Sequence, residues 1–462
     1  MATEKFGPSY DLKALLSSNS VSVGLFHTAG KGTRLAPLPA SENNNKPGVK
    51  LPAVVDVMDS ENNVTTQESL TILEAVVKQT GIYAASRKGR LSVFWGDQVF
   101  IPSEAFQYEI SHHIDIMCTL DTMVDRKEWL SRGLDKYGVI AVGSDGEAAQ
   151  VEKVDYDTAI LMLKSLGGVE MVGPSLGSFS VSAVMLAALC TECRSELNEK
   201  SGKFDTDPHF WMPMTLKESD YVKLMMGKGT DAATATSHHT RMTRMKKSFQ
   251  QKTVNLDNSS LGLFGAVNVG SEACWWDYGQ LKLYSKNNLK LLENDENASL
   301  LRDFFGVTKR ISGSTISDSV KICDASCVFA SEANNGSISG SVLSCVHCGE
   351  IDANGAILVN VTAKSIKAAK GSILYNVVDD SEEGVVVGEG EVRVGVFDKL
   401  GGQSVVNSSL AIDGGKVWKE AVAGNANSFE GIHSENRNSD VAEIENQRLS
   451  AHKRLKLSIT SR

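Results

Sequence analysis

The sequence lacks any apolar run long enough to span a lipid bilayer. Its start, MATEKFGPSYDLKALLSS, also lacks the apolar core of a secretory signal peptide and the arginines of a transit peptide. These absences argue against an integral membrane protein and against a secreted one. The sequence therefore predicts a cytoplasmic location and no membrane partner.

An excess of positive charge is lacking too, because the formal net charge is −9 at pH 7. A protein whose main partner is nucleic acid normally carries a basic surface, so we expect no nucleic-acid partner. An enzyme that acts on nucleotides needs only a few cationic side chains in one pocket. The net charge therefore leaves a nucleotide substrate open.

Cysteines are few, with eight in 462 residues, which excludes the disulfide framework of a small secreted protein. Two pairs, Cys190/Cys193 and Cys345/Cys348, have the spacing of zinc ligands. The first pair lies in a helix-like run and the second in a strand repeat. We therefore favour packed or surface thiols over a four-cysteine zinc site.

What the sequence does contain is a glycine-rich turn directly after the strand-like run at 21–26. Gly30 and Gly32 have no Cβ, so the backbone can turn sharply there and aim its N–H groups at anionic oxygens. Arg34 and Lys46 can neutralise the charge of those oxygens. An ordinary strand-to-helix turn is the alternative for the glycines alone, and the two cations favour a phosphate site.

This stretch resembles the signature of the sugar-1-phosphate nucleotidyltransferases, which reads approximately G-x-G-T-R-x-x-P-L-T with a Lys-Pro some residues later. Here it reads GKGTRLAPLP over 30–39, and Lys46-Pro47 follows the polar insert SENNN. Pro39 replaces the usual threonine, and the insert moves the lysine further along the chain. Lys50 is therefore a second candidate for the signature lysine.

Four more segments match the family in the family's order. They are WGD at 95–97, the YGVI, DG and VEK pieces of a hairpin-like stretch at 137–153, SLGSF at 175–179, and WWDYGQ at 275–280. Each piece alone is common, and the series in this order favours the family.

The resemblance implies a role for each matched residue. Arg34 and Lys46 would be the catalytic cations, and Asp97 and Asp277 would hold Mg²⁺. Gln67 is our candidate for contact with the base. The full nucleotide-binding set would be Ala29, Gly30, Gly32, Thr33, Gln67 and Gly96, and the sugar-phosphate-binding set would be Gly138, Glu152, Lys153 and Ser175.

The implied reaction is Mg²⁺-assisted in-line displacement between a nucleoside triphosphate and a hexose 1-phosphate, which yields a nucleotide sugar and pyrophosphate. Glucose 1-phosphate is favoured as the sugar, and UTP is slightly favoured over ATP and GTP. A non-catalytic regulatory or scaffold subunit of the same architecture is the alternative. A dinucleotide-dependent oxidoreductase is disfavoured because the third glycine of its fingerprint is missing.

The predicted fold of residues 1–300 is a three-layer α/β/α, Rossmann-like nucleotidyltransferase domain around a mostly parallel sheet. The pattern alternates strands with helices, and ligands of such sheets bind outside the carboxyl ends of the strands. The expected strands are 21–26 and 91–96, and the expected helices are 69–86, 181–199 and 216–227. The basic segment 237–252 is expected to form a solvated helix face, or else a lid or effector-phosphate site.

Residues 311–378 change character, with apolar residues recurring every six positions and related strands repeating at offsets of fifteen and sixteen residues. This repetition predicts a parallel β-helix over 305–415, with an ordinary antiparallel β-domain as the alternative. The family resemblance favours a left-handed coil that serves regulation or assembly, including a homo-oligomer. Residues 425–462 are polar and are predicted to form a disordered or loosely helical tail.

Overall fold

The computed structural model describes residues 11–28, 30–101, 110–199, 205–253, 261–270, 274–437 and 439–460. The chain forms two compact units, which we call the α/β unit and the β-helix unit. The α/β unit comprises Met1–His27, Thr80–Trp95 and Pro102–Ala273, and the β-helix unit comprises Thr28–Gln79, Gly96–Ile101 and Cys274–Arg462. The glycine turn therefore belongs to the same unit as the β-helix, whereas the sequence places it in one domain with the rest of 1–300.

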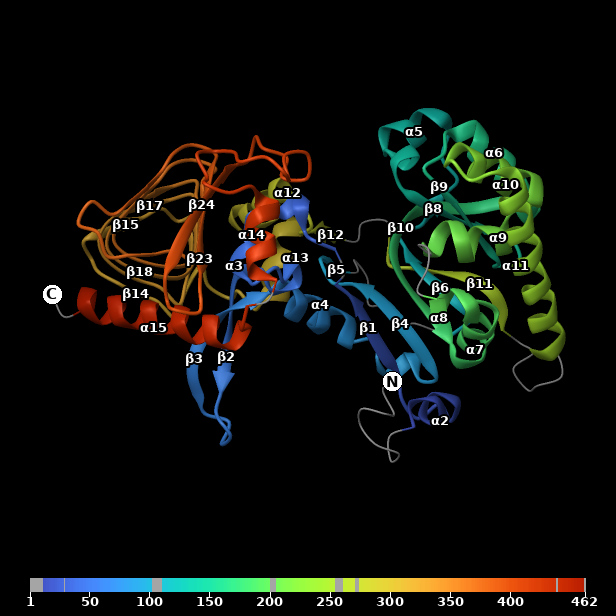
Figure 1. The fold of residues 1–462 in the computed structure, drawn as a ribbon, viewed down its shortest axis with the longest axis horizontal. Helices are drawn as coiled ribbons and strands as arrows, with labels where there is room; N and C mark the ends of the chain where they lie inside the picture. The colour runs from blue at the N-terminus through green and yellow to red at the C-terminus, as the bar shows by residue number, and fades with distance from the viewer. Residues whose placement is uncertain are drawn as a thin grey trace. The chain divides into compact units, whose positions relative to one another are not determined.

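The α/β unit is built on a mixed eight-stranded sheet whose main path runs β1-β4-β10-β6-β11 (Figure 1). Strands β1 and β4 are parallel, as are β6 and β11, whereas β10 runs antiparallel to both β4 and β6. The sheet is therefore less parallel than expected, because the long β10 separates the two parallel pairs. The strands are β1 (Val23–His27), β4 (Arg90–Trp95), β6 (His112–Cys118), β7 (Asp121–Thr122), β8 (Gly138–Gly143), β9 (Ala148–Glu152), β10 (Val169–Ser182) and β11 (Gly262–Asn268).

The helices of the α/β unit confirm the helices expected at 181–199 and 216–227, and the basic segment lies on a helix. Buried Met185 and Leu189 on one of them pack with Trp211 and Phe264 in a common core. The helices are α2 (Leu12–Ser17), α5 (Arg126–Ser131), α6 (Tyr156–Leu163), α7 (Ala183–Glu192), α8 (Arg194–Glu199), α9 (Met212–Thr215), α10 (Glu218–Gly227) and α11 (Ala232–Thr253), with the π-helical turn η6 (Asp207–Trp211) before α9.

Before its solenoid begins, the β-helix unit contains two small antiparallel ribbons and several helices. The ribbons are β2 (Lys50–Met58) with β3 (Val64–Thr71), and β5 (Gln98–Ile101) with β12 (Cys274–Asp277). The helix expected at 69–86 begins only at Ile72, because the residues before it belong to β3. The helices are α3 (Leu38–Ser41), α4 (Ile72–Gly81), α12 (Leu281–Leu289) and α13 (Glu296–Phe305).

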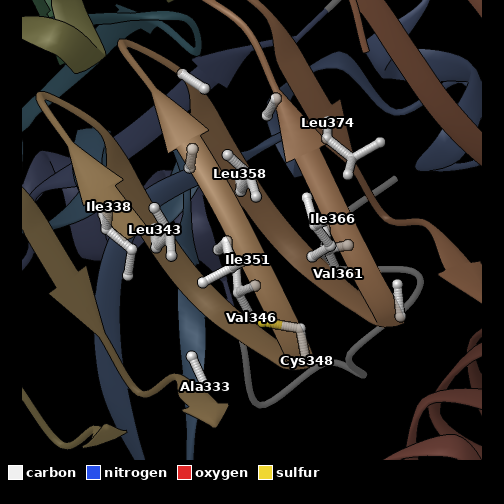
Figure 2. Close-up of a cluster of buried hydrophobic side chains, with 14 of the residues drawn as sticks. Ala333, Ile338, Leu343, Val346, Cys348, Ile351, Leu358, Val361, Ile366 and Leu374 are labelled. Atoms are coloured by element: carbon white, nitrogen blue, oxygen red, sulfur yellow. The ribbon is translucent and has the colours of Figure 1, made fainter. Parts of the chain in front are cut away.

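The solenoid stacks parallel strands from successive coils, as the repeat predicts. Val342 pairs with Ile357 and Ile357 with Ile373, while Leu343, Leu358 and Leu374 lie in register one coil apart, inside the coils (Figure 2). The strands are β13 (Ile311–Ser312), β14 (Thr315–Ile316), β15 (Val320–Ile322), β16 (Cys327–Phe329), β17 (Glu332–Ser339), β18 (Val342–Asn354), β19 (Ile357–Ala368), β20 (Ile373–Tyr375), β21 (Val378–Asp379), β22 (Val385–Val387) and β23 (Glu391–Phe397). After the last coil, β24 (Gln403–Ser409) pairs antiparallel with β23. An α/β fold followed by a parallel β-helix is therefore confirmed, and the handedness of the coil stays a prediction.

The described residues after 425 are helical, so of the two predicted alternatives the helical tail holds and the disordered one does not. They form α14 (Phe429–Asn436) and α15 (Val441–Thr460), and α15 packs along β18 and β19 (Figure 1). Few of these residues are large and apolar, but Phe429 and Ile432 are buried and Arg448 and His452 are buried as well. Within the described ranges, no helix has the length and apolar character needed to cross a membrane.

Candidate functional site

The glycine turn leads into the short helix η1 (Thr33–Leu35) and has the backbone conformation that glycine allows. Gly30 has a φ of 111° and Gly32 a φ of 65°, both in the region that side chains disfavour. A Cβ on Gly32 would lie only 3.3 Å from the Cβ of Lys46. The glycine therefore lets the lysine pack directly against the turn. Ala29 lies outside the described residues.

The ribbon of β5 and β12 brings two aspartates from distant parts of the chain to one end. Asp277 is in register with Gln98, so Asp97, one residue earlier, lies at the same end of the ribbon. The amide of Tyr278 donates to the carbonyl oxygen of Asp97 at 2.9 Å, and Asn287 Nδ2 donates to the carbonyl oxygen of Asp277 at 2.9 Å. Hydrogen bonds to their carbonyl oxygens thus fix both residues.

Lys46, Asp97 and Asp277 converge on Gly279. Lys46 Nζ forms an ion pair with Asp97 Oδ2, and the Gly279 amide donates to Asp277 Oδ1 at 2.6 Å. A Cβ on Gly279 would lie 2.6 Å from Asp97 Oδ2, 2.9 Å from Asp277 Oδ1 and 3.3 Å from Lys46 Nζ. The cluster therefore requires glycine at this position. We call these four residues the carboxylate cluster.

The electrostatics of the carboxylate cluster leave Asp277 short of positive charge. Burial raises the pKa of Asp277 above its usual range, and the Asp97 carboxylate raises it further. The Gly279 amide and the charges of Arg34 and Lys46 lower that pKa only in part. A further cation would therefore be bound favourably by these two carboxylates.

Of the two candidate signature lysines, Lys46 is the one that reaches Asp97. Lys50 Nζ instead pairs with Glu42 Oε1 at 2.8 Å, and Glu42 accepts from the hydroxyl of Tyr375 on the same oxygen. Both partners of this second pair are largely buried. Lys50 therefore belongs to the packing of the unit's interior.

The other predicted nucleotide-binding residues are placed by three different elements. Thr33 begins η1, and Gly96 is buried immediately before Asp97. Gln67 lies on β3, where its Nε2 donates to Asp56 Oδ1 at 2.8 Å. Its Oε1 would lie 2.2 Å from a Cβ on Gly313, so the side chain contacts the first coil of the solenoid. A role for Gln67 at the base stays a prediction.

The α/β unit brings Gly138 and Glu152 together across the β8–β9 hairpin, which confirms that hairpin. A Cβ on Gly138 would lie 2.8 Å from Glu152 Oε2 and 3.7 Å from Asp207 Oδ2. Sequence reasoning missed Asp207, which comes from η6 and belongs to no motif of the resemblance. Burial and the Glu152 carboxylate raise the pKa of Asp207 to about 6. Glu152 and Asp207 thus form a pair of neighbouring carboxylates beside Gly138.

Pro174 on β10 pairs with Val139 on β8, and the two strands are antiparallel. Ser175, the next residue on β10, therefore lies towards Gly138 on β8. Its Oγ accepts from the Gly177 amide at 3.0 Å within a bulge of β10. Lys153 is exposed, has a φ of 54° and pairs with Glu152 Oε1 at 3.0 Å. The predicted sugar-phosphate residues therefore all lie in the α/β unit.

The glycine of this bulge supports an aromatic side chain. Gly177 has a φ of 73°, and a Cβ there would lie 2.1 Å from the indole Nε1 of Trp95. Trp95 also packs against His27, with ring centroids 4.7 Å apart. The SLGSF segment thus holds the indole in place on the α/β unit.

The candidate metal ligands of the described residues are the carboxylates of Asp97 and Asp277. Among the residues that the structure describes, no group of three or more His, Cys, Asp or Glu side chains is arranged to hold a metal ion. Asp97 and Asp277 can still hold Mg²⁺ together with phosphate and water oxygens, as hard cations prefer. Cys345 and Cys348 are buried free thiols on β18.

Comparisons with known proteins give likenesses among solved structures alone. No family model matches the chain, and a search of curated proteins finds no match. Among solved structures, the chain is similar to one described as a candidate glucose-1-phosphate thymidylyltransferase from Bacillus anthracis in complex with a sucrose. The identity is 9% and the TM-score 0.27, over 62% of this chain and 99% of that one.

Proposed function

We propose that the protein is a sugar-1-phosphate nucleotidyltransferase that joins a hexose 1-phosphate to a nucleoside triphosphate and releases pyrophosphate. Glucose 1-phosphate is the favoured sugar, and UTP is favoured over ATP and GTP. The observation that carries the proposal is the convergence of Lys46, Asp97 and Asp277 at Gly279. A turn of two glycines, a lysine and two buried carboxylates is the equipment that a triphosphate with a divalent cation needs.

The β-helix unit would bind the triphosphate. The amides of Gly30 and Gly32 would cradle phosphate oxygens, and Arg34 would offer its planar fork to the β- and γ-phosphates. Lys46 would place a point charge near the α-phosphate. Asp97 and Asp277 would hold Mg²⁺, whose chemistry when bound is to neutralise phosphate charge. The under-compensated Asp277 fits such a cation.

The predicted sugar-phosphate residues would bind the sugar 1-phosphate. Lys153 would pair with its phosphate, and Glu152 would accept hydrogen bonds from sugar hydroxyls, with Gly138 leaving room for the ring. A phosphate oxygen of the sugar attacks the α-phosphorus, the bond from that phosphorus to the bridging oxygen breaks, and pyrophosphate departs with the electron pair. The protein's own work is alignment and charge neutralisation.

The experiment is pyrophosphate release in the presence of Mg²⁺ from the four common ribonucleoside triphosphates against glucose, galactose, mannose and N-acetylglucosamine 1-phosphates. We expect one productive pair. Silence across the matrix from folded protein that still binds a nucleotide would overturn catalysis in favour of a regulatory or scaffold subunit. The cytoplasmic location and a homo-oligomer through the β-helix stay predictions.

A further inference from the structure

A segment near the C-terminus packs against the glycine turn within the β-helix unit. This segment, residues 413–436, consists of a short turn with the sequence DGGKVW, a connecting loop and α14. We call it the C-terminal clasp. It belongs to no motif of the family resemblance, and the sequence predicts part of it to be a disordered or loosely helical tail.

Two glycines of the clasp allow a close approach to the turn. A Cβ on Gly414 would lie 2.5 Å from the carbonyl oxygen of Thr33 and 3.1 Å from the Cβ of Ala36. A Cβ on Gly415 would lie 3.3 Å from the Cγ of Arg34. The aliphatic stem of the arginine therefore rests on the Gly415 backbone, while Arg34 as a whole stays exposed.

Polar contacts hold α14 and its loop to the residues around the turn. Asn44 Nδ2 donates to the His433 carbonyl oxygen at 2.7 Å, and Asn436 Nδ2 donates to the Ala40 carbonyl oxygen at 2.7 Å. Lys31, which lies between the two glycines of the turn, has its Nζ 3.9 Å from Glu430 Oε1 and 6.0 Å from the ring centroid of Trp418. The clasp thus touches both the start and the end of the signature segment.

We propose that the C-terminal clasp positions Arg34 for triphosphate binding, with Gly415 as the positioning residue; the role of Arg34 rests on the proposed function. An arginine side chain loses considerable rotamer freedom when it is fixed, so a stem already held by packing binds an anion at a lower entropic cost. Gly415 acts here through Arg34 and touches no substrate.

A double-mutant cycle tests this coupling. Gly415→Val places branched carbons where the arginine stem lies, Arg34→Ala removes the stem and its charge, and the third variant combines both. Binding of inorganic tripolyphosphate with Mg²⁺ is measured by calorimetry. We expect each single variant to weaken binding roughly tenfold or more, the scale of a lost charge-assisted hydrogen bond. The double variant should bind no more weakly than Arg34→Ala alone, whereas additive losses would overturn the proposal.

Matched variants separate this effect from a general loss of stability. Gly227→Val is the control, because open space surrounds the Cβ position of Gly227 on α10. The single added carbon of Gly415→Ala would lie 3.2 Å from Asp413 Oδ1 and 3.3 Å from Arg34 Cγ, so it needs only small shifts of these two side chains and should restore most of the affinity. A Gly415→Ala variant as weak as Gly415→Val, or a Gly227→Val variant equally weak, would contradict positioning through Arg34.

A readout without ligand keeps this test distinct from the proposed function. The Leu35 amide donates to the Gly32 carbonyl oxygen at 2.9 Å, and the Ala36 amide donates to the Thr33 carbonyl oxygen at 3.3 Å. The hydrogen exchange of these two amide protons therefore reports on the stability of the turn. We expect their hydrogen exchange to be at least roughly tenfold faster in Gly415→Val and unchanged in Gly227→Val. Unchanged exchange in Gly415→Val would overturn the proposal that the clasp positions Arg34. If wild-type protein binds no polyphosphate while exchange is still faster in Gly415→Val, only the proposed function of the turn is overturned.

Discussion

Glu42 and Arg448 form an ion pair inside the β-helix unit although 406 residues separate them, with Arg448 Nη1 3.2 Å from Glu42 Oε2. The Tyr375 hydroxyl donates to Glu42 Oε1 at 2.5 Å, and Asn376 Nδ2 donates to the same oxygen at 2.7 Å. Burial raises the pKa of Glu42, but the charges of Arg448 and Lys50 outweigh it and lower that pKa to about 2. This buried cluster anchors α15.

Replacing Arg448 by Met should destabilise the β-helix unit strongly. The substitution leaves the Glu42 carboxylate buried with one cationic partner fewer, and breaking a buried pair from one side costs about 3–5 kcal/mol. Urea unfolding followed by circular dichroism measures the loss. Arg454→Met, at an exposed position of the same helix, is the control and should cost less than about 1 kcal/mol. Equal losses in the two variants would contradict the anchoring role.

Asp207→Asn should stabilise the protein increasingly as the pH rises. The folded-state pKa of Asp207 is raised from 3.8 to about 6, so its protonated form favours folding at low pH and this contribution is lost as the carboxyl ionises. The advantage of the variant should therefore grow between about pH 4 and 6, to about 3 kcal/mol, and then level off. Urea unfolding across this range measures the difference, with the exposed Asp205→Asn as the control. A difference that does not vary with pH would show that Asp207 has an ordinary pKa.

Asp277→Asn should abolish turnover and leave the fold intact. Asparagine keeps the shape of the side chain and can still accept from the Gly279 amide, but it removes the charge that would hold Mg²⁺. We expect kcat to fall roughly 10²–10³-fold or more, with an unchanged circular dichroism spectrum. Asp318→Asn, an exposed carboxylate of the solenoid, is the control. Near-normal turnover in Asp277→Asn would refute the metal role.

The two candidate lysines should control different properties of the protein, with Lys46 controlling turnover and Lys50 controlling stability. Lys46→Met removes the cation at Asp97 and should lower kcat, whereas Lys50→Met removes one of the two cationic partners of the buried Glu42 and should lower stability by about 3 kcal/mol. Pyrophosphate release and urea unfolding of both variants measure the split. Retained activity in Lys46→Met with lost activity in folded Lys50→Met would reverse the assignment.

The parts of the molecule that the sequence predicts well are those set by local patterns. The tight turn at Asp145-Gly146 fixes the β8–β9 hairpin, and the recurring apolar strands fix the solenoid, because each coil must stack to bury its face.

The features that escaped prediction depend on partners far away in the chain. Arg448 and His452 make α15 look polar, yet both are buried against residues of β-strands and of the segment near Glu42. Asp207 acquires its environment only when η6 packs beside β9. The antiparallel course of β10 results from its pairing with β4 and β6 at once. Such pairings between distant parts of the chain cannot be predicted from residue composition or from the spacing of motifs.

Because the C-terminal clasp lies late in the chain, the glycine turn gains this packing only near the end of synthesis. The glycine turn is made within the first forty residues, but the clasp that packs on it lies at 413–436. At a translation rate of about 5–20 residues per second, the turn waits on the order of tens of seconds for this contact. A chain that stops short of residue 413 would present every motif of the family resemblance and still lack the packing around its signature arginine.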